Sequence, residues 1–104
     1  MQEQVIVLYL NRANKVIGYY RHTTGGVNST IMDVKLIIST ALKSLSSGII
    51  IAHNHPSGDQ RPSIEDTNFT KRMSLACEAV GLSLLDHLVF NHGPAYSFRI
   101  AGLV

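Results

Sequence analysis

Two histidines and one aspartate stand at intervals that would let them share a metal ion. His53 and His55 end an apolar run, and Asp66 follows after a short loop. Alternate residues of a strand point to the same side, about 6–7 Å apart, so the two imidazoles can converge on one ion. Two nitrogen ligands and one oxygen ligand leave a fourth zinc position for water, as in catalytic zinc sites. The sequence therefore predicts a hydrolytic metal centre.

A buried strand and the helix after it must position these groups. Residues 48–53 (GIIIAH) are apolar and β-branched, which is typical of a strand buried on both faces. Open α/β sheets place their ligands beyond strand ends of this kind. We expect Pro56 and Gly58 to turn the chain, and a helix to begin at about Ser63. Asp66 then lies nearly on the same helical face as Ser63, one turn on, so the helix start can return to the strand end.

Ser63 and Asp66 also have a purely structural explanation. Ser/Thr-x-x-Asp/Glu is the helix capping box, in which the two residues hydrogen-bond each other's backbone amides. Spacing within this pair does not separate capping from metal binding, and only the two histidines favour the metal. A residue at the start of a helix can cap the backbone and still face an ion, so we expect that both roles can hold together.

The remaining pattern predicts an α/β fold. Strands are expected at 4–10, 15–23, 82–91 and 95–100, in addition to 48–53. Asp33 is expected to cap a first helix, and Gly81 to end the second. The order ββαβαββ predicts a mixed sheet with a helix against each face, which is a three-layer sandwich.

Composition limits the classes of protein to which this chain can belong. A chain of 104 residues with 45% apolar and 15% charged residues is expected to form one soluble globular domain. It has no apolar run long enough for a membrane span and no signal-peptide pattern, and the lone Cys77 excludes an internal disulfide framework. These features favour the cytoplasm. The net charge is +2, and the nine Lys and Arg residues are scattered, so no nucleic-acid-binding stripe is visible.

The motif as a whole resembles one known family. His53, His55, Ser63 and Asp66 match the JAMM (MPN-plus) metalloprotease pattern: His-x-His, seven residues, Ser, two residues, Asp. The residues around this motif resemble the RadC-like branch of the family in particular. The resemblance extends over residues 1–104, as one domain. The matching segments read HNHPSGD at 53–59, PS at 62–63, LDHL at 85–88 and YSF at 96–98.

The resemblance implies a JAB/MPN, cytidine-deaminase-like fold and one Zn²⁺ per chain held by His53, His55 and Asp66. It assigns the general base to Glu3, and to Ser63 a hydrogen bond to the oxyanion. The implied reaction is hydrolysis of a peptide or isopeptide bond in a protein or peptide substrate by a metal-activated water. Among the other carboxylates, Asp59 is the main rival of Glu3 as the base.

Two other functional classes remain open. A nucleic-acid-binding module in a repair or mobile-element setting would bind DNA with an affinity that falls steeply with salt, but the scattered basic residues argue against it. A catalytically silent scaffold would keep the fold without using Glu3. RadC-like proteins usually carry an N-terminal helix-hairpin-helix region, which nothing before Gln4 could encode, so we expect an excised domain or a short stand-alone member. A single cysteine excludes the zinc base deaminases.

Overall fold

The computed structural model describes residues 3–24, 33–55, 62–90 and 93–104. The predicted turn at Pro56 and Gly58 lies outside these residues. Helices and strands follow the predicted order, and most bounds agree with the sequence pattern to within about two residues, as is usual for such assignments. The elements are β1 (Glu3–Leu10), β2 (Val16–Thr24), α1 (Val34–Lys43), β3 (Gly48–Asn54), α2 (Ile64–Ala79), β4 (Ser83–Phe90) and β5 (Tyr96–Ser97).

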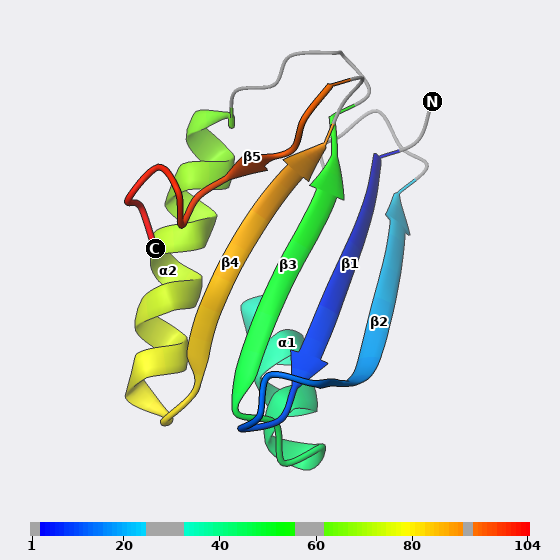
Figure 1. The fold of residues 1–104 in the computed structure, drawn as a ribbon, viewed down its shortest axis with the longest axis vertical. Helices are drawn as coiled ribbons and strands as arrows, with labels where there is room; N and C mark the ends of the chain where they lie inside the picture. Colours follow the sequence, from blue (N-terminus) through cyan, green and yellow to red (C-terminus); the bar gives the residue numbers. More distant parts are fainter. Residues whose placement is uncertain (1–2, 25–32, 56–61, 91–92) are drawn as a thin grey trace.

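The five strands form one mixed sheet in the order β2-β1-β3-β4-β5 (Figure 1). β1 is antiparallel to both β2 and β3, β3 is parallel to β4, and β5 is antiparallel to β4. β3 therefore lies at the centre, where both of its edges are hydrogen-bonded. Its register pairs His53 with Val5 on one side and with Val89 on the other. The predicted α/β class and mixed sheet are confirmed.

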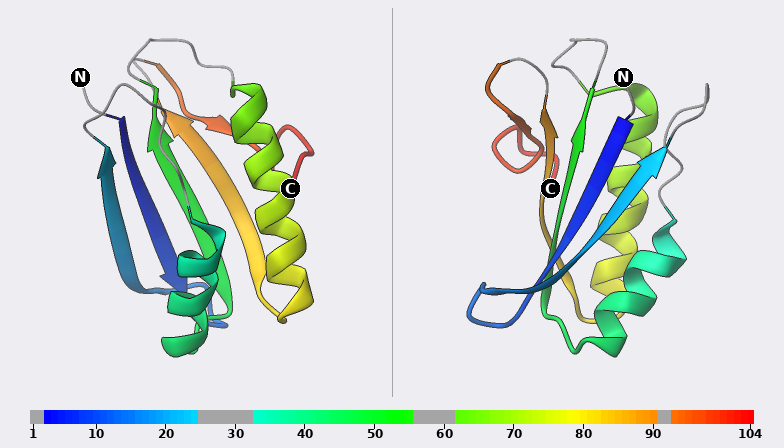
Figure 2. Two further views of the ribbon diagram at one scale, coloured as in Figure 1. Left: turned by 180° about the vertical axis from the view of Figure 1, so that it is seen from behind. Right: turned by 90° about the vertical axis from the view of Figure 1, so that its right-hand side faces the viewer.

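The placement of the helices differs from the expected sandwich with a helix against each face. Figure 2 shows α1 and α2 side by side on the same face of the sheet. Ile37 and Ala41 of α1 join the same buried cluster as Met73 and Cys77 of α2. Among the described residues, the two helices thus make one layer against the sheet.

Chain direction explains this arrangement. β2 is parallel to β3 because both are antiparallel to β1, so α1 is a crossover between parallel strands, just as α2 is between β3 and β4. Such crossovers are almost always right-handed. Both steps move across the sheet in the same direction, from β2 to β3 and from β3 to β4. Two right-handed crossovers in one direction leave their helices on one face, and the element order alone does not reveal that direction.

Local signals explain where the helices begin and end. The Asp33 carboxylate accepts hydrogen bonds from the amides of Lys35 and Leu36, as an N-cap does. α2 ends at Ala79, and Gly81 two residues later has a φ of 79°, which suits glycine; the Leu82 amide closes the turn on the Cys77 carbonyl at 2.8 Å. Within the described residues, neither helix is long and apolar enough to cross a membrane.

The last strand is shorter than the sequence pattern predicts. β5 covers only Tyr96–Ser97, and the chain then turns instead of extending to residue 100. The Ala101 amide bonds the Ser97 carbonyl at 3.1 Å, and the Leu103 amide bonds the Phe98 carbonyl at 2.8 Å. These local bonds replace a strand ladder, and they leave Phe98 fully buried.

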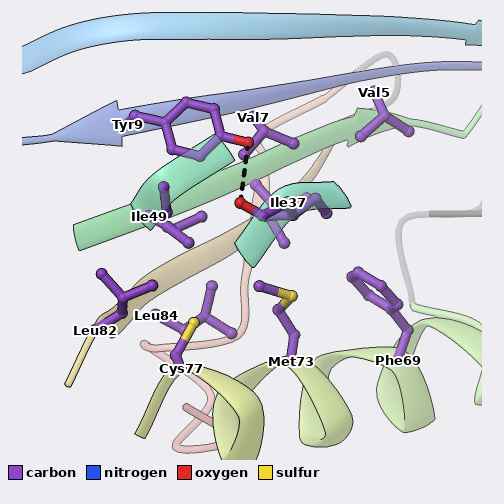
Figure 3. Close-up of a cluster of buried hydrophobic side chains, with 12 residues drawn as sticks. Val5, Val7, Tyr9, Ile37, Ile49, Phe69, Met73, Cys77, Leu82 and Leu84 are labelled. Atoms are coloured by element: carbon purple, nitrogen blue, oxygen red, sulfur yellow. Dashed lines mark hydrogen bonds between the residues drawn. The ribbon is translucent and has the colours of Figure 1, made fainter. Parts of the chain in front are cut away.

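A single apolar core fills the space between the sheet and the two helices. Figure 3 shows Phe69, Met73 and Cys77 of α2 directed toward the strands, and the Tyr9 hydroxyl donating to the Ile37 carbonyl at 3.4 Å. The core fixes α2 against the central strands, so it also fixes the start of α2 relative to the end of β3. Its buried members are Val5, Val7, Tyr9, Ile37, Ala41, Ile49, Ile51, Phe69, Met73, Cys77, Leu82 and Leu84.

Replacing Met73 with alanine tests whether this core anchors α2. Met73 has no exposed surface, so Met73→Ala should lower the free energy of unfolding by about 2–5 kcal/mol. Leu75, on the same helix, is 69% exposed, so Leu75→Ala should change that free energy by no more than about 0.5 kcal/mol. Urea unfolding followed by circular dichroism measures both, and equal losses in the two variants would contradict the packing described.

Candidate metal centre

His53, His55 and Asp66 meet at the end of β3, as the sequence predicts. His55 Nε2 lies 2.9 Å from Asp66 Oδ2, and His53 Nε2 lies 3.4 Å from Asp66 Oδ1. One candidate ligand atom from each residue lies within 4.8 Å of the others. Residues distant in the chain thus bring two imidazole nitrogens and a carboxylate to one point.

The backbone of β3 holds both histidines. His53 is paired on both sides within the sheet and is only 2% exposed. The His55 amide donates to the Phe90 carbonyl at 2.7 Å, which continues the ladder to β4 one residue beyond β3. Alternation along the strand then directs the two rings to the same side, and their centroids are 4.8 Å apart.

The start of α2 holds Asp66. Ser63 Oγ accepts from the Asp66 amide at 3.0 Å, and Asp66 Oδ2 accepts from the Ser63 amide at 2.9 Å, so the predicted capping box is formed. Burial by itself raises the pKa of Asp66, but the neighbouring His53 side chain and the hydrogen bond from the Ser63 amide outweigh it and lower the pKa well below the ordinary value. The Asp66 carboxylate is therefore anionic at neutral pH.

The geometry of these donors fits a zinc ion. Zn–N and Zn–O bonds of about 2.1 Å in a tetrahedron place neighbouring ligand atoms about 3.4 Å apart. The nitrogen–oxygen separations of 2.9 and 3.4 Å, each to a different oxygen of Asp66, lie close to that value, and one candidate ligand atom from each residue lies within 4.8 Å of the others. Neutral imidazole and carboxylate are ligands that zinc accepts, and three protein ligands leave a fourth position for water.

Ser63 lies beside the predicted ligands with its side chain exposed. Its oxygen accepts the Asp66 amide hydrogen, and a serine hydroxyl that accepts can still donate its own hydrogen. Capping and a second hydrogen bond are thus compatible. The capping role of Ser63 is confirmed, and its hydrogen bond to an oxyanion stays a prediction.

Of Glu3, the structure describes only the backbone. It begins β1 and pairs with Thr24 of β2. The Gln4 amide donates to Asn54 Oδ1 at 2.6 Å, which ties this end of β1 to the end of β3 next to His53. The rival base, Asp59, lies outside the described residues. The choice between the two carboxylates stays a prediction.

His87 and Thr70 also belong to this centre, and the sequence pattern does not single them out. His87 is fully buried in β4; its Nε2 lies 2.8 Å from His53 Nδ1, and its Nδ1 lies 2.6 Å from Thr70 Oγ1. Burial and, next in size, the electrostatic effect of the neighbouring His53 lower the pKa of His87 to about 3, so this imidazole is neutral at neutral pH. The nearest signal in the sequence is the segment 85–88 that resembles RadC-like proteins.

Asp86 and His87 face opposite sides of β4, as expected for strand neighbours. The Asp86 carboxylate accepts from Ser97 Oγ at 2.6 Å and from the Arg99 amide at 3.0 Å, so it fixes the turn that follows β5. That turn stacks the Phe98 ring on the His87 ring, with centroids 4.7 Å apart and planes within 8°. Asp86 therefore holds the turn that places Phe98 against His87.

Comparison with known proteins shows which family the chain belongs to. A family model described as the RadC-like JAB domain matches residues 1–103. The chain is 44% identical over 103 residues to a UPF0758 protein of Aquifex aeolicus, which covers 99% of this chain and 45% of that protein. It is 43% identical over 98 residues to a UPF0758 protein of Streptococcus suis, covering 94% of this chain and 40% of the relative.

A UPF0758 protein of Porphyromonas gingivalis is 44% identical over 104 residues, which cover 99% of this chain and 46% of the relative. The chain thus spans less than half the length of each of these three proteins. The names of these relatives state no activity. The match of the family model over nearly all residues nevertheless shows the family: this chain belongs to the RadC-like JAB domains.

Proposed function

We propose that this chain is a zinc-dependent hydrolase that cleaves a peptide or isopeptide bond in a protein or peptide substrate. The observation that carries the proposal is the convergence of His53, His55 and Asp66 within 4.8 Å at the end of the central strand. Membership of the JAB domains, a family that includes metallohydrolases, supports it. The resemblance to the JAMM motif supports zinc as the metal.

The residues of the centre have complementary tasks in this proposal. When bound, zinc would lower the pKa of a water toward about 7 and polarise the substrate carbonyl. Asp66 offsets part of the ionic charge, and the Ser63 hydroxyl donates to the oxygen on which negative charge develops. Glu3 takes the proton of the attacking water and returns it to the leaving amine, as a positioned acid–base group does.

We also propose the cytoplasm as the compartment and a protein or peptide as the partner. Cys77, the single cysteine, is buried in the core and makes no disulfide, which suits a reducing compartment. The nine Lys and Arg residues form no cluster along the chain that would favour nucleic acid as the substrate.

Metal binding is tested by removing one ligand at a time. The purified chain should bind about one zinc ion, and Asp66→Asn or the double variant His53→Ala, His55→Ala should lose it. Asp33→Asn is the matched control, because Asp33 also caps a helix but touches neither histidine. Metal analysis and calorimetric titration measure the difference. An unchanged zinc content in the ligand variants would refute the site.

Glu3→Gln tests the proposed general base. The rate of hydrolysis should fall about 10²–10⁴-fold while zinc content stays at the wild-type level, since the change removes a proton acceptor and no ligand. Cleavage of fluorogenic peptide and isopeptide substrates measures the rate. Asp59→Asn is the paired variant: if it abolishes activity while Glu3→Gln does not, the assignment of the base to Glu3 is wrong.

Two substitutions of Ser63 separate capping from chemistry. Ser63→Ala should lower the free energy of unfolding by about 1 kcal/mol, whereas Ser63→Gly should lower it by only a few tenths, since glycine is tolerated as an N-cap. Both variants lack the hydroxyl, so both should lose a similar part of the hydrolysis rate. If the rate follows stability instead, so that Ser63→Gly is as active as wild type, Ser63 only caps the helix.

A further inference from the structure

We propose that Thr70 and His87 are positioning residues that fix the tautomer of His53 and so present its Nε2 lone pair to the metal. This inference rests on the proposed metal site and adds to it a set of hydrogen bonds behind the ligands. Neither residue is one of the three candidate ligands. They would act through His53.

A continuous chain of hydrogen bonds joins two of the three ligands. Thr70 Oγ1 lies 2.7 Å from the backbone carbonyl of Asp66 and 2.6 Å from His87 Nδ1. His87 Nε2 in turn lies 2.8 Å from His53 Nδ1. The chain begins on the backbone of the ligand from α2 and ends on the imidazole of the ligand from β3.

The Asp66 carbonyl sets the direction of this chain, because a carbonyl oxygen only accepts. The Thr70 hydroxyl donates its one hydrogen to that carbonyl, so its oxygen accepts a hydrogen bond from His87 Nδ1–H. A neutral imidazole with its hydrogen on Nδ1 has a lone pair on Nε2, which accepts from His53 Nδ1–H. His53 is then left with its lone pair on Nε2, the atom that faces Asp66.

If these hydrogen bonds ran in the opposite direction, His53 could not bind the metal through Nε2. If His87 Nε2 carried the hydrogen, it would donate to His53 Nδ1, and a neutral His53 would carry its own hydrogen on Nε2, where the ion must bind. Metal ligands of this kind depend on their second nitrogen: the hydrogen bond made there selects the tautomer and orients the ring. For His53, the partner of the second nitrogen is another histidine, His87. The tautomer of His87 must therefore be fixed too, and its hydrogen bond to Thr70 fixes it.

Packing holds the side chains of Thr70 and His87 in place. Thr70 and His87 are both essentially fully buried, so water does not compete for their hydrogen bonds. Phe98 stacks on the His87 ring, and Phe69 meets it edge-on with centroids 6.3 Å apart. Aromatic contacts on two sides resist rotation of the ring, which would exchange its two nitrogens.

The test compares three threonine variants of the full chain with zinc itself as the probe. Thr70→Val keeps the shape of the side chain but removes the hydroxyl, and zinc affinity should fall about 10–100-fold. Thr70→Ser restores the hydroxyl and should bind near wild type. Thr67→Val is the matched control on the same helix, since Thr67 makes the same type of bond, to the Ser63 carbonyl at 3.2 Å, without reaching a histidine. Competition titration against a chromophoric chelator gives the affinities.

A spectroscopic readout distinguishes positioning from simple stability. Long-range ¹H–¹⁵N correlations of the zinc-loaded wild type should show the hydrogen on Nδ1 of both His53 and His87. A hydrogen on Nε2 of His87, or wild-type zinc affinity in Thr70→Val, would overturn the inference while leaving the metal site intact. Absence of zinc binding by the wild type would instead refute the proposed function on which the inference depends.

Discussion

A buried carboxylate between two imidazoles is the constraint on which the rest of this structure depends. Asp66 is only 8% exposed, and an ionised carboxylate is stable at such a place only when hydrogen bonds and opposite charge compensate its lost hydration. The Ser63 amide donates to Asp66 Oδ2, and the His53 and His55 rings lie 3.4 and 2.9 Å from the two carboxylate oxygens. The bond from the Ser63 amide belongs to the capping box of α2, so the start of the helix and the candidate ligands form one unit. Moving the start of α2 away from the end of β3 would separate the carboxylate from both imidazoles.

The candidate ligands could be predicted in two pairs, because the geometry within each pair is local. His53 and His55 share a side through the period of two in a strand, and Ser63 and Asp66 meet through the period of the helix. The ends of the helices could also be predicted from the sequence: Asp33 caps α1, and Gly81 has the positive φ that follows the end of α2. Each of these features depends on neighbours within a few residues, which is the range over which sequence pattern determines conformation.

Features that depend on strands far apart in the chain could not be predicted. The two helices share a face because both crossovers move in one direction across the sheet, and strand order is set by pairing, not by element order. The turn after β5 depends on Asp86, which fastens Ser97 and Arg99 from the neighbouring strand. His87 reaches His53 only through the register of β3 against β4. No periodic pattern in the sequence indicates that His87 lies next to His53.

That register contains one irregularity, and the position of His87 follows from it. Ile49 pairs with Leu84, but Ile50 pairs with Asp86, so Leu85 is an extra residue in β4. Without this bulge, Asp86 would stand opposite Ile51 and face the helices, and His87 would point to the other side. The Leu85 side chain packs over Gly48, where a Cβ would lie 2.8 Å from Leu85 Cδ1. One extra residue in β4 thus directs a histidine toward the candidate metal centre, and residue spacing in the sequence does not reveal it.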